Sequence, residues 1–513
     1  MPLFFWRILA YLADPIPIRC SFLLLSLTVL FIQLPTVGAA PAKTSKEAAL
    51  NRDPVVRVNA TNQVWDFIRP WSKRAPFTRR ALGVVLAGNR VLVTAELVAN
   101  ANYVELEKAE SGEKVAATVE LVDYESNLAL IKTSDDKFLA GIKPMELTDA
   151  SVGDHITIWQ LENTGSLLST SAVVTTVEAS RYPMDDSMLL VYRLATSLQY
   201  RDGSFTVPAI KDGKLIGMLM RYDPRSQSAD AIPTPVIQHF LKDAAGKTYA
   251  GFPRAGMDFA GMRDPQLRHY VGLNGNPGGG VYITAVQKNS PADKAGLRAG
   301  DVLLAINGQA VDQDGNYTDP HYGKISLIHL VSTRGYVGDK LKLHLFRDGK
   351  PLDAEVTLAH RPVEDFVIEP YTIDKAPPYY VLGGLVFQEL SRQYLKEWGD
   401  WQKKAPERLV YLDRYQSELF PDGGKKVIFL SQVLPSENTV GYEELNNLVV
   451  TKINDIPLNS LADVAKAVEK PLDGFHKIEF AESPHVIYLD AKKVADDSPA
   501  LMQNYGLRSL QRL

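Results

Sequence analysis

Ser204 is a candidate nucleophile, in the segment Gly-Ser-Phe-Thr-Val-Pro that spans residues 203–208. A serine hydroxyl attacks a carbonyl efficiently only when an imidazole takes its proton and a carboxylate holds that imidazole. Residues 81–245 contain two histidines, His155 and His239. His155 lies in an alternating segment typical of a strand, so we interpret it as a strand-edge residue. We therefore interpret Ser204 as a turn hydroxyl and keep the nucleophile as the alternative.

Three segments of this region carry the residues on which a family resemblance rests. They are 90–98 (Arg-Val-Leu-Val-Thr-Ala-Glu-Leu-Val), 123–132 (Asp-Tyr-Glu-Ser-Asn-Leu-Ala-Leu-Ile-Lys) and 203–208. They resemble the HtrA/Deg family of chymotrypsin-type serine proteases. The resemblance places Glu96 at the family's histidine, Asn127 at its aspartate and Phe205 at its serine, or Ser204 if the alignment slips by one residue.

These replacements remove the chemistry that the resemblance would otherwise imply. Glu96 and Asn127 cannot act together as a base and its orienting carboxylate. Phe205 and the residues after it replace the small residues of the turn that presents N–H groups to the oxyanion. Loss of a triad lowers turnover by about a million-fold. We therefore predict a pseudoprotease with no catalytic residues; an active serine endopeptidase with an unconventional site around Ser204 is the alternative.

The composition and the N-terminal residues limit the class of protein. The 513 residues are 45% hydrophobic with a net charge of −4, which suits three or four globular domains and argues against a nucleic-acid partner. An apolar run at 21–34 follows Arg19 and precedes small residues, which predicts a signal peptide (1–39) cleaved after Ala39; an uncleaved anchor is the alternative. The mature chain would lack Cys20, the single cysteine, and we expect it in the periplasm or secreted.

The elements that must position these residues are mainly β. Short alternating segments such as 115–122 and 215–220 predict a degenerate chymotrypsin-like double β-barrel over 81–245. Residues 40–80 form an N-terminal extension whose aromatic segment, 64–71, either supports trimers, as the resemblance implies, or packs on the chain's own core.

Residues 258–361 resemble a PDZ domain of the bacterial permuted type. The matching segments are 280–286, 290–297 and 300–308. We expect an edge strand at 280–286, a helix opened by Ser290 and Pro291, and a hairpin turn at Asn307–Gly308. PDZ domains add a peptide as a strand and hold its carboxylate with loop N–H groups. The resemblance therefore assigns peptide binding to Gly278, Gly279, Gly280, Val281, Tyr282 and Ile283; a slack glycine connector is the alternative.

Residues 363–513 resemble the divergent last PDZ-like α+β domain of plant-type Deg proteases, with a helical insertion at 392–424. The segment Leu382, Gly383, Gly384 and Leu385 either holds a carboxylate or begins a buried strand, and both alternatives stay open.

The combined prediction is an exported protein that binds peptide C-termini or unfolded polypeptides and acts as a chaperone, adaptor or regulatory scaffold. We expect a homo-oligomer, a trimer or larger multiple; a subunit that pairs with an active Deg protease is another class. No cofactor and no metal are expected, because the histidines are scattered and no phosphate-binding glycine loop precedes a helix.

Overall fold

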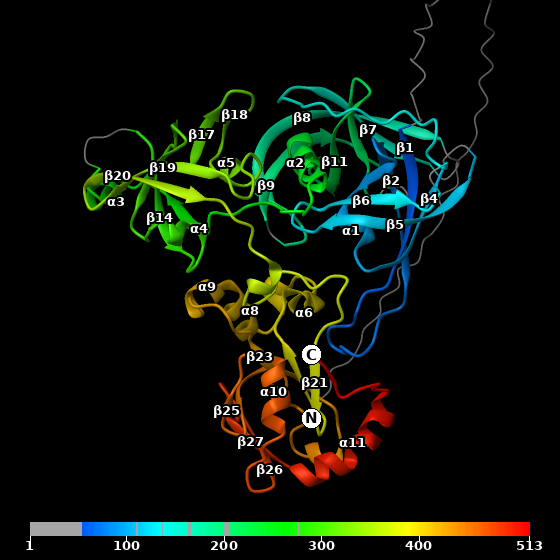
Figure 1. Cartoon of the computed structure of the whole chain (residues 1–513), viewed down its shortest axis with the longest axis vertical. Helices are drawn as coiled ribbons and strands as arrows, with labels where there is room; N and C mark the ends of the chain where they lie inside the picture. Colours follow the sequence, from blue (N-terminus) through cyan, green and yellow to red (C-terminus); the bar gives the residue numbers. More distant parts are fainter. Residues whose placement is uncertain are drawn as a thin grey trace, which may run out of the picture. The chain divides into compact units, whose positions relative to one another are not determined.

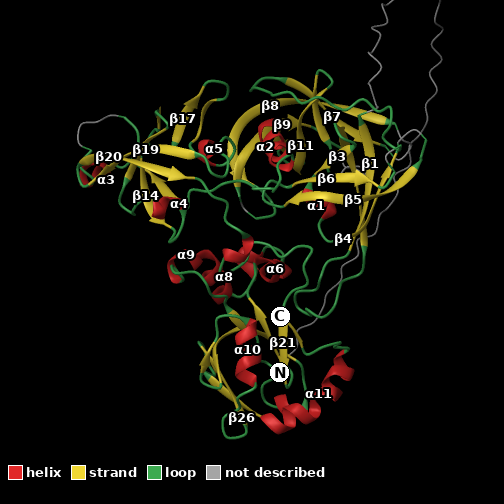
Figure 2. Ribbon diagram, in the orientation of Figure 1, coloured by secondary structure: helices red, strands yellow, loops and turns green. Residues whose placement is uncertain are grey.

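The computed structural model describes residues 54–108, 111–135, 137–162, 166–185, 187–199, 205–273 and 278–513, all within one compact unit. The predicted signal peptide, Cys20 and Ser204 lie outside the described residues. The predicted fold class is confirmed: two closed six-stranded barrels are followed by two sheets with short helices (Figures 1 and 2). In the described ranges, no helix combines the length and apolarity needed to span a membrane.

The first barrel has the strand order β1-β2-β3-β6-β5-β4. Its elements are β1 (Val55–Asn62), β2 (Phe77–Leu86), β3 (Arg90–Val93), α1 (Ala95–Val98), β4 (Ala101–Glu107), β5 (Lys114–Asp123) and β6 (Leu128–Thr133). Alternating apolar residues fill the interior, and a Cβ on Gly83 would lie 2.5 Å from Val91 Cγ1, so this strand position needs glycine. The boundary predicted at residue 81 falls inside β2, because β1 and the start of β2 already belong to the barrel.

The second barrel has the order β10-β11-β12-β9-β8-β7 and is followed by a helix. Its elements are β7 (His155–Leu161), β8 (Leu167–Arg181), β9 (Met188–Thr196), β10 (Pro208–Lys211), β11 (Lys214–Asp223), β12 (Ser228–Pro233) and α2 (Thr234–Ala244). The predicted strands at 115–122 and 215–220 lie in β5 and β11 and are confirmed.

The third part is a sheet of order β13-β14-β15-β19-β20, with β16 paired to β15 and a separate β17–β18 hairpin. The helix opened by Ser290 is confirmed, since its hydroxyl accepts a hydrogen bond from the Asp293 N–H. The turn at Asn307–Gly308 is also confirmed, with φ of 50° and 78°. The elements are β13 (Met257–Gly261), α3 (Pro265–Tyr270), β14 (Val281–Val286), α4 (Pro291–Lys294), β15 (Val302–Ile306), β16 (Gln309–Ala310), β17 (Asn316–Asp319), β18 (Gly323–Ser326), α5 (Ile328–Val331), β19 (Lys340–Arg347) and β20 (Lys350–Thr357).

The last part is a sheet of order β27-β26-β24-β23-β22-β21-β28, with β25 paired to β24. The predicted helical insertion at 392–424 is confirmed by four short helices, α6 to α9. The strands are β21 (Tyr379–Leu382), β22 (Leu385–Glu389), β23 (Ile428–Val433), β24 (Leu448–Ile453), β25 (Ile456–Pro457), β26 (Phe475–Phe480), β27 (Val486–Asp490) and β28 (Gln511–Arg512). The helices are α6 (Arg392–Leu395), α7 (Trp401–Lys404), α8 (Glu407–Arg414), α9 (Gln416–Leu419), α10 (Leu461–Val468) and α11 (Ala491–Tyr505).

The aromatic loop between β1 and β2 packs on this last part of the same chain. Phe67 is buried in a cluster with Leu390 and Tyr394, and its carbonyl accepts a hydrogen bond from Gln388 Nε2 at 3.1 Å. Trp71 meets Tyr379 edge-on, with ring centroids 6.0 Å apart. Of the two roles left open for this segment, packing on the chain's own core is the one that the structure displays.

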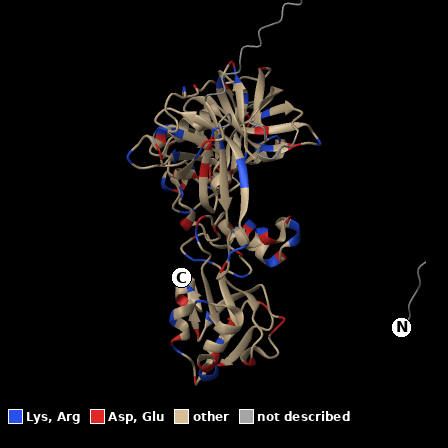
Figure 3. Ribbon diagram, turned by 90° about the vertical axis from the view of Figure 1, so that its right-hand side faces the viewer, with Lys and Arg blue, Asp and Glu red and all other residues tan. Residues whose placement is uncertain are grey.

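Charged side chains are mixed by sign along the ribbon in the view of Figure 3. Lys and Arg number 56 against 60 Asp and Glu, so neither sign dominates the chain.

Candidate functional site

Glu96 and Asn127, 31 residues apart in the sequence, lie in direct contact. Asn127 is fully buried, with φ of 54°, and its Oδ1 accepts a hydrogen bond from the Glu96 backbone N–H at 2.9 Å. Its carbonyl accepts a second bond from the Ala95 N–H at 3.0 Å, so the loop before β6 is tied to the start of α1. The positions singled out by the sequence resemblance therefore meet, with an amide and a carboxyl as their functional groups.

Arg79 connects these two residues to Phe205. Its guanidinium donates a hydrogen bond to the Glu96 carbonyl and lies over the Phe205 ring, 4.5 Å from the centroid. Phe77, two residues earlier on β2, also presents its ring, at 5.2 Å. The Arg79 side chain is half-buried, whereas the neighbouring Arg80 is exposed. Alternation along β2 puts residues 77, 79 and 81 on one face, and this was the sequence signal for the position of Arg79.

Burial dominates the electrostatics of this site. It raises the pKa of the Glu96 carboxyl, although the charges of Arg79, Lys396 and Arg221 favour the ionised form. Burial also lowers the pKa of the Arg79 guanidinium, against the attraction of Glu96. A carboxyl with a raised pKa accepts a proton more readily, so Glu96 is the group here that resembles a general base.

The segment at Phe205 is fixed to β2 by backbone hydrogen bonds. The Phe205 N–H donates to the Arg80 carbonyl at 3.1 Å, and the Leu82 N–H donates to the Thr206 carbonyl at 3.1 Å. An oxyanion hole needs the nucleophile's own backbone N–H to point at the reacting carbonyl. At Phe205 this N–H is already consumed, so the position offers neither a nucleophile nor that donor.

His239 is held in surroundings that do not suit a general base. Its ring is stacked between Phe252 and Tyr336, with centroids 4.2 and 4.0 Å away, and its Nδ1 lies 3.0 Å from the Thr333 carbonyl. Burial lowers its pKa. His155 begins β7 and is exposed, as expected of a strand-edge residue. In the described ranges no group of three His, Cys, Asp or Glu is placed to hold a metal.

The expectation that the strand at 280–286 is an edge strand is wrong. β14 pairs with β13 on one side and with β15 on the other, and Val281 and Ile283 are fully buried. The preceding turn is packed too, because a Cβ on Gly279 would lie 2.2 Å from the Val311 carbonyl oxygen, which accepts the Gly280 N–H. Of the residues assigned to peptide capture, Val281, Tyr282 and Ile283 therefore lie in an interior strand, Gly279 and Gly280 form its tight approach, and Gly278 is exposed.

β13 is one edge of this sheet, and β20 is the other. β13 follows Arg254 and Gly256, the latter with φ of 76°, and most of its residues are partly or fully exposed. A cavity of about 930 Å³ is lined by Met257 and Phe259 of this strand and by Ile328 and Val331 of α5. The rest of the lining includes charged side chains such as Lys288, Arg361 and Asp422. An edge strand beside a partly apolar cavity is a geometry that accepts a peptide as an added strand. Sequence reasoning missed it because 19 residues and α3 separate β13 from β14.

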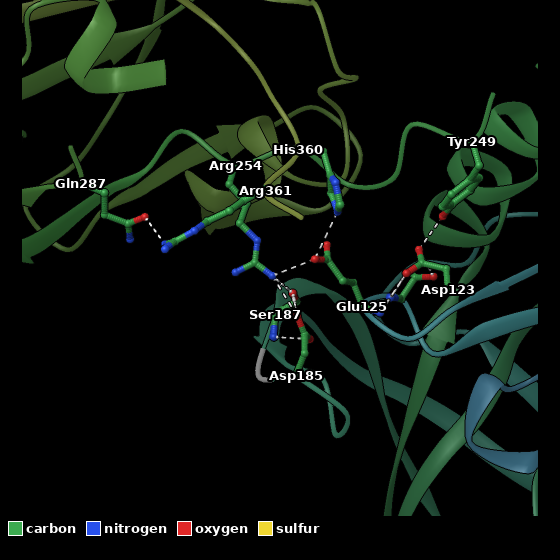
Figure 4. A network of polar contacts seen from close by, with 10 residues as sticks. Asp123, Glu125, Asp185, Ser187, Tyr249, Arg254, Gln287, His360 and Arg361 are labelled. Atoms are coloured by element: carbon green, nitrogen blue, oxygen red, sulfur yellow. Dashed lines mark hydrogen bonds and ion pairs between the residues drawn. The ribbon is translucent and has the colours of Figure 1, made fainter. Parts of the chain in front are cut away.

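Arg254, at the entrance to β13, belongs to a buried ionic network (Figure 4). Its guanidinium lies 2.8 Å from an Asp185 carboxylate oxygen and 3.3 Å from one of Glu125. His360 lies 3.3 Å from the same Glu125 oxygen, and this hydrogen bond raises the pKa of the imidazole. Since Glu125 precedes Asn127 by two residues, the network joins the edge-strand entrance to the loop that carries Asn127.

The segment 382–385 is a buried hairpin turn. A Cβ on Gly383 would lie 2.8 Å from Val494 Cγ2, and the Gly384 carbonyl accepts the Leu434 N–H at 2.7 Å. Leu382 and Leu385 are both buried. Of the two alternatives left open for Leu382, Gly383, Gly384 and Leu385, the buried strand start is the one that the structure displays.

This chain is similar to PDZ domains and to Do-like proteases. Models of the PDZ domain match residues 282–319 and 368–511. Protease Do-like 2, chloroplastic, from Arabidopsis thaliana is 28% identical, over 91% of this chain and 76% of that protein. Protease Do-like 4, mitochondrial, from the same plant is 26% identical, over 84% and 79%. A solved structure, the HtrA-type protease AlgW with decapeptide, covers 61% of this chain and 97% of its own, at 16% identity and a TM-score of 0.45.

Proposed function

The homologues of this chain are Deg/HtrA proteases with PDZ domains, and from this premise we propose that the chain is a pseudoprotease. It binds peptides or unfolded polypeptides through a PDZ domain and acts as a chaperone, adaptor or regulatory scaffold.

The single observation that carries the proposal is the state of the Phe205 position. Its ring lies against Arg79 and its N–H bonds the Arg80 carbonyl, so this position supplies neither a nucleophile nor that oxyanion donor. Glu96 stands where an imidazole would have to take the proton.

Peptide binding is assigned to β13 and the adjoining cavity, in place of the loop at 278–283. The apolar lining from Ile328 and Val331 favours peptides with apolar side chains, and Arg254 adds a positive charge at the strand's entrance. Asp185 and Glu125 already neutralise this guanidinium, so recognition depends mainly on strand pairing and on the apolar side chains of the cavity.

The test is covalent labelling with a fluorophosphonate probe, together with incubation with casein. The pseudoprotease leaves casein intact and takes up no label. Labelling that disappears in Ser204→Ala would overturn the proposal and establish the second candidate, a serine endopeptidase. That candidate is favoured by one observation, the raised pKa of Glu96, which would let a carboxyl serve as the base.

Self-assembly, export and a heteromeric role complete the proposal. The PDZ domains and the HtrA-type relatives are consistent with oligomers, and we propose a trimer or larger multiple, with mixed assembly with an active Deg protease as the other arrangement. Co-purification from the native envelope distinguishes the two. We also propose export, to the periplasm or outside the cell; N-terminal sequencing of the mature protein should begin at Ala40.

A further inference from the structure

The edge of the second PDZ-like sheet is covered by the chain's own C-terminus. β28 pairs antiparallel with β21, so that Arg512 lies opposite Tyr379 and Gln511 opposite Tyr380. The Val381 N–H donates to the Leu510 carbonyl at 2.7 Å. Without β28, β21 would be the end strand of its sheet, as β13 is an end strand of the other. The C-terminal residues therefore occupy on β21 the place that an added peptide strand would take on β13.

Arg512 is held in a pocket of its own. Its Nη1 donates to the Pro70 carbonyl at 2.9 Å and to the Pro377 carbonyl at 3.3 Å. Its guanidinium carbon lies 4.6 Å from the centroid of the Trp65 ring and 5.2 Å from that of Tyr379. Two carbonyl oxygens and two aromatic rings are a binding site for a planar cation.

The paired segment is short and lies apart from the domain's main core. α11 ends at Tyr505 and is capped by Gly506, whose φ is 64°, and Leu507 is the buried residue that follows. Beyond it, Leu510 is partly buried, while Arg508, Gln511 and Leu513 are exposed. Besides the Arg512 contacts, the segment is held by the Val381 N–H bond to the Leu510 carbonyl, by packing of Leu510, and by a hydrogen bond of 2.9 Å that the Tyr379 hydroxyl donates to the Ser509 carbonyl. All these contacts lie at the end of the sheet, so the segment can leave β21 without unfolding the sheet.

We propose that β21, with the pocket formed by Trp65, Tyr379, Pro70 and Pro377, is a binding site for an extended peptide strand that carries arginine, and that residues 509–513 are its resident ligand. Recognition depends on strand pairing and on the arginine. It is independent of whether β13 of the first PDZ domain binds peptides. While the tail is bound, an outside peptide must compete with a ligand tethered to the same chain.

The test uses a fluorescein-labelled peptide with the sequence of residues 506–513, followed by fluorescence anisotropy. A chain that ends at Arg508 should bind this peptide at least tenfold more tightly than the intact chain does. The same peptide with Arg512→Ala should lose at least tenfold in affinity, because it lacks both the carbonyl bonds and the ring contacts. The matched peptide with Arg508→Ala, whose altered side chain is exposed, should bind as the unaltered one does.

A second measurement on the intact chain covers the case in which truncation disturbs folding. Arg512→Ala in the intact chain should speed hydrogen exchange of the Val381 amide at least tenfold, and Arg508→Ala should leave it unchanged. Equal peptide binding by the intact and shortened chains, equal loss from the two arginine changes, or unchanged Val381 exchange would each overturn the proposal.

Discussion

Asp185 makes the stability of this protein depend on pH, in the direction opposite to an ordinary ion pair. Burial raises the pKa of its carboxyl from 3.8 to about 6, with a contribution from Glu125, and outweighs the attraction of Arg254. The folded state thus binds the proton more tightly than the unfolded chain, so this group's contribution to stability is complete below about pH 4 and is lost as the pH rises through about 6.

The size of this effect on stability follows from the pKa shift of Asp185. A rise of about two pKa units corresponds to about 3 kcal/mol, of which about 2 kcal/mol falls between pH 7 and pH 4.5. Asp185→Asn keeps an oxygen for Arg254 and Ser187 but removes the titration. We therefore expect the difference in unfolding free energy between wild type and Asp185→Asn to move by about 2 kcal/mol in favour of wild type as the pH falls over that interval.

Urea unfolding followed by tryptophan fluorescence at the two pH values measures this difference. Asp212→Asn is the control, because Asp212 is exposed and its φ of 51° suits asparagine equally well. Comparing mutant with wild type at each pH cancels the contribution of His360, whose raised pKa also favours the folded state in acid. A wild-type-minus-mutant difference that stays constant between the two pH values would refute the reasoning.

Three further outcomes are expected. Gly83→Ala should lower the unfolding free energy by about 1–3 kcal/mol in urea titrations, because the added Cβ overlaps Val91; an unchanged midpoint would contradict the packing argument. Phe205→Ser should stay unlabelled by a fluorophosphonate, since a hydroxyl without an imidazole remains a weak nucleophile, and stoichiometric labelling would show another base at work. Ile328→Glu should weaken binding of an apolar peptide about tenfold in anisotropy titrations by placing a charge in the cavity, whereas Tyr270→Glu, on the exposed α3, should not; equal effects would remove β13 as the site.

Alternation was enough to predict the strands of the barrels, and the family resemblance marked Glu96 and Asn127 as positions of one site. Alternation marks each strand wherever one face is buried, and the two motifs lie directly beside strands whose pairing brings them together. The turn at Asn307–Gly308 was predictable for a similar reason, because its conformation is set by the two residues themselves.

The errors concern contacts set by distant residues. Whether β14 is an edge or an interior strand depends on β13, which reaches it from across α3, and nothing in 280–286 itself distinguishes the two. The desolvation of Arg79 depends on Phe205, 126 residues later. The strand β1 was missed although Val55–Asn62 is rich in β-branched residues, because its partner β2 begins only after the aromatic loop.

The contacts of the aromatic loop also have a consequence for folding during synthesis. The Phe67 carbonyl can pair with Gln388 only after the ribosome has made that residue, which lies 321 residues further along the chain. At translation speeds of about 5–20 residues per second, the ribosome needs roughly 15–60 s to make that partner. During this interval the loop's phenylalanine and tryptophans lack the surface that covers them in the folded chain, so we expect the nascent chain to expose this aromatic cluster until residue 388 has been made.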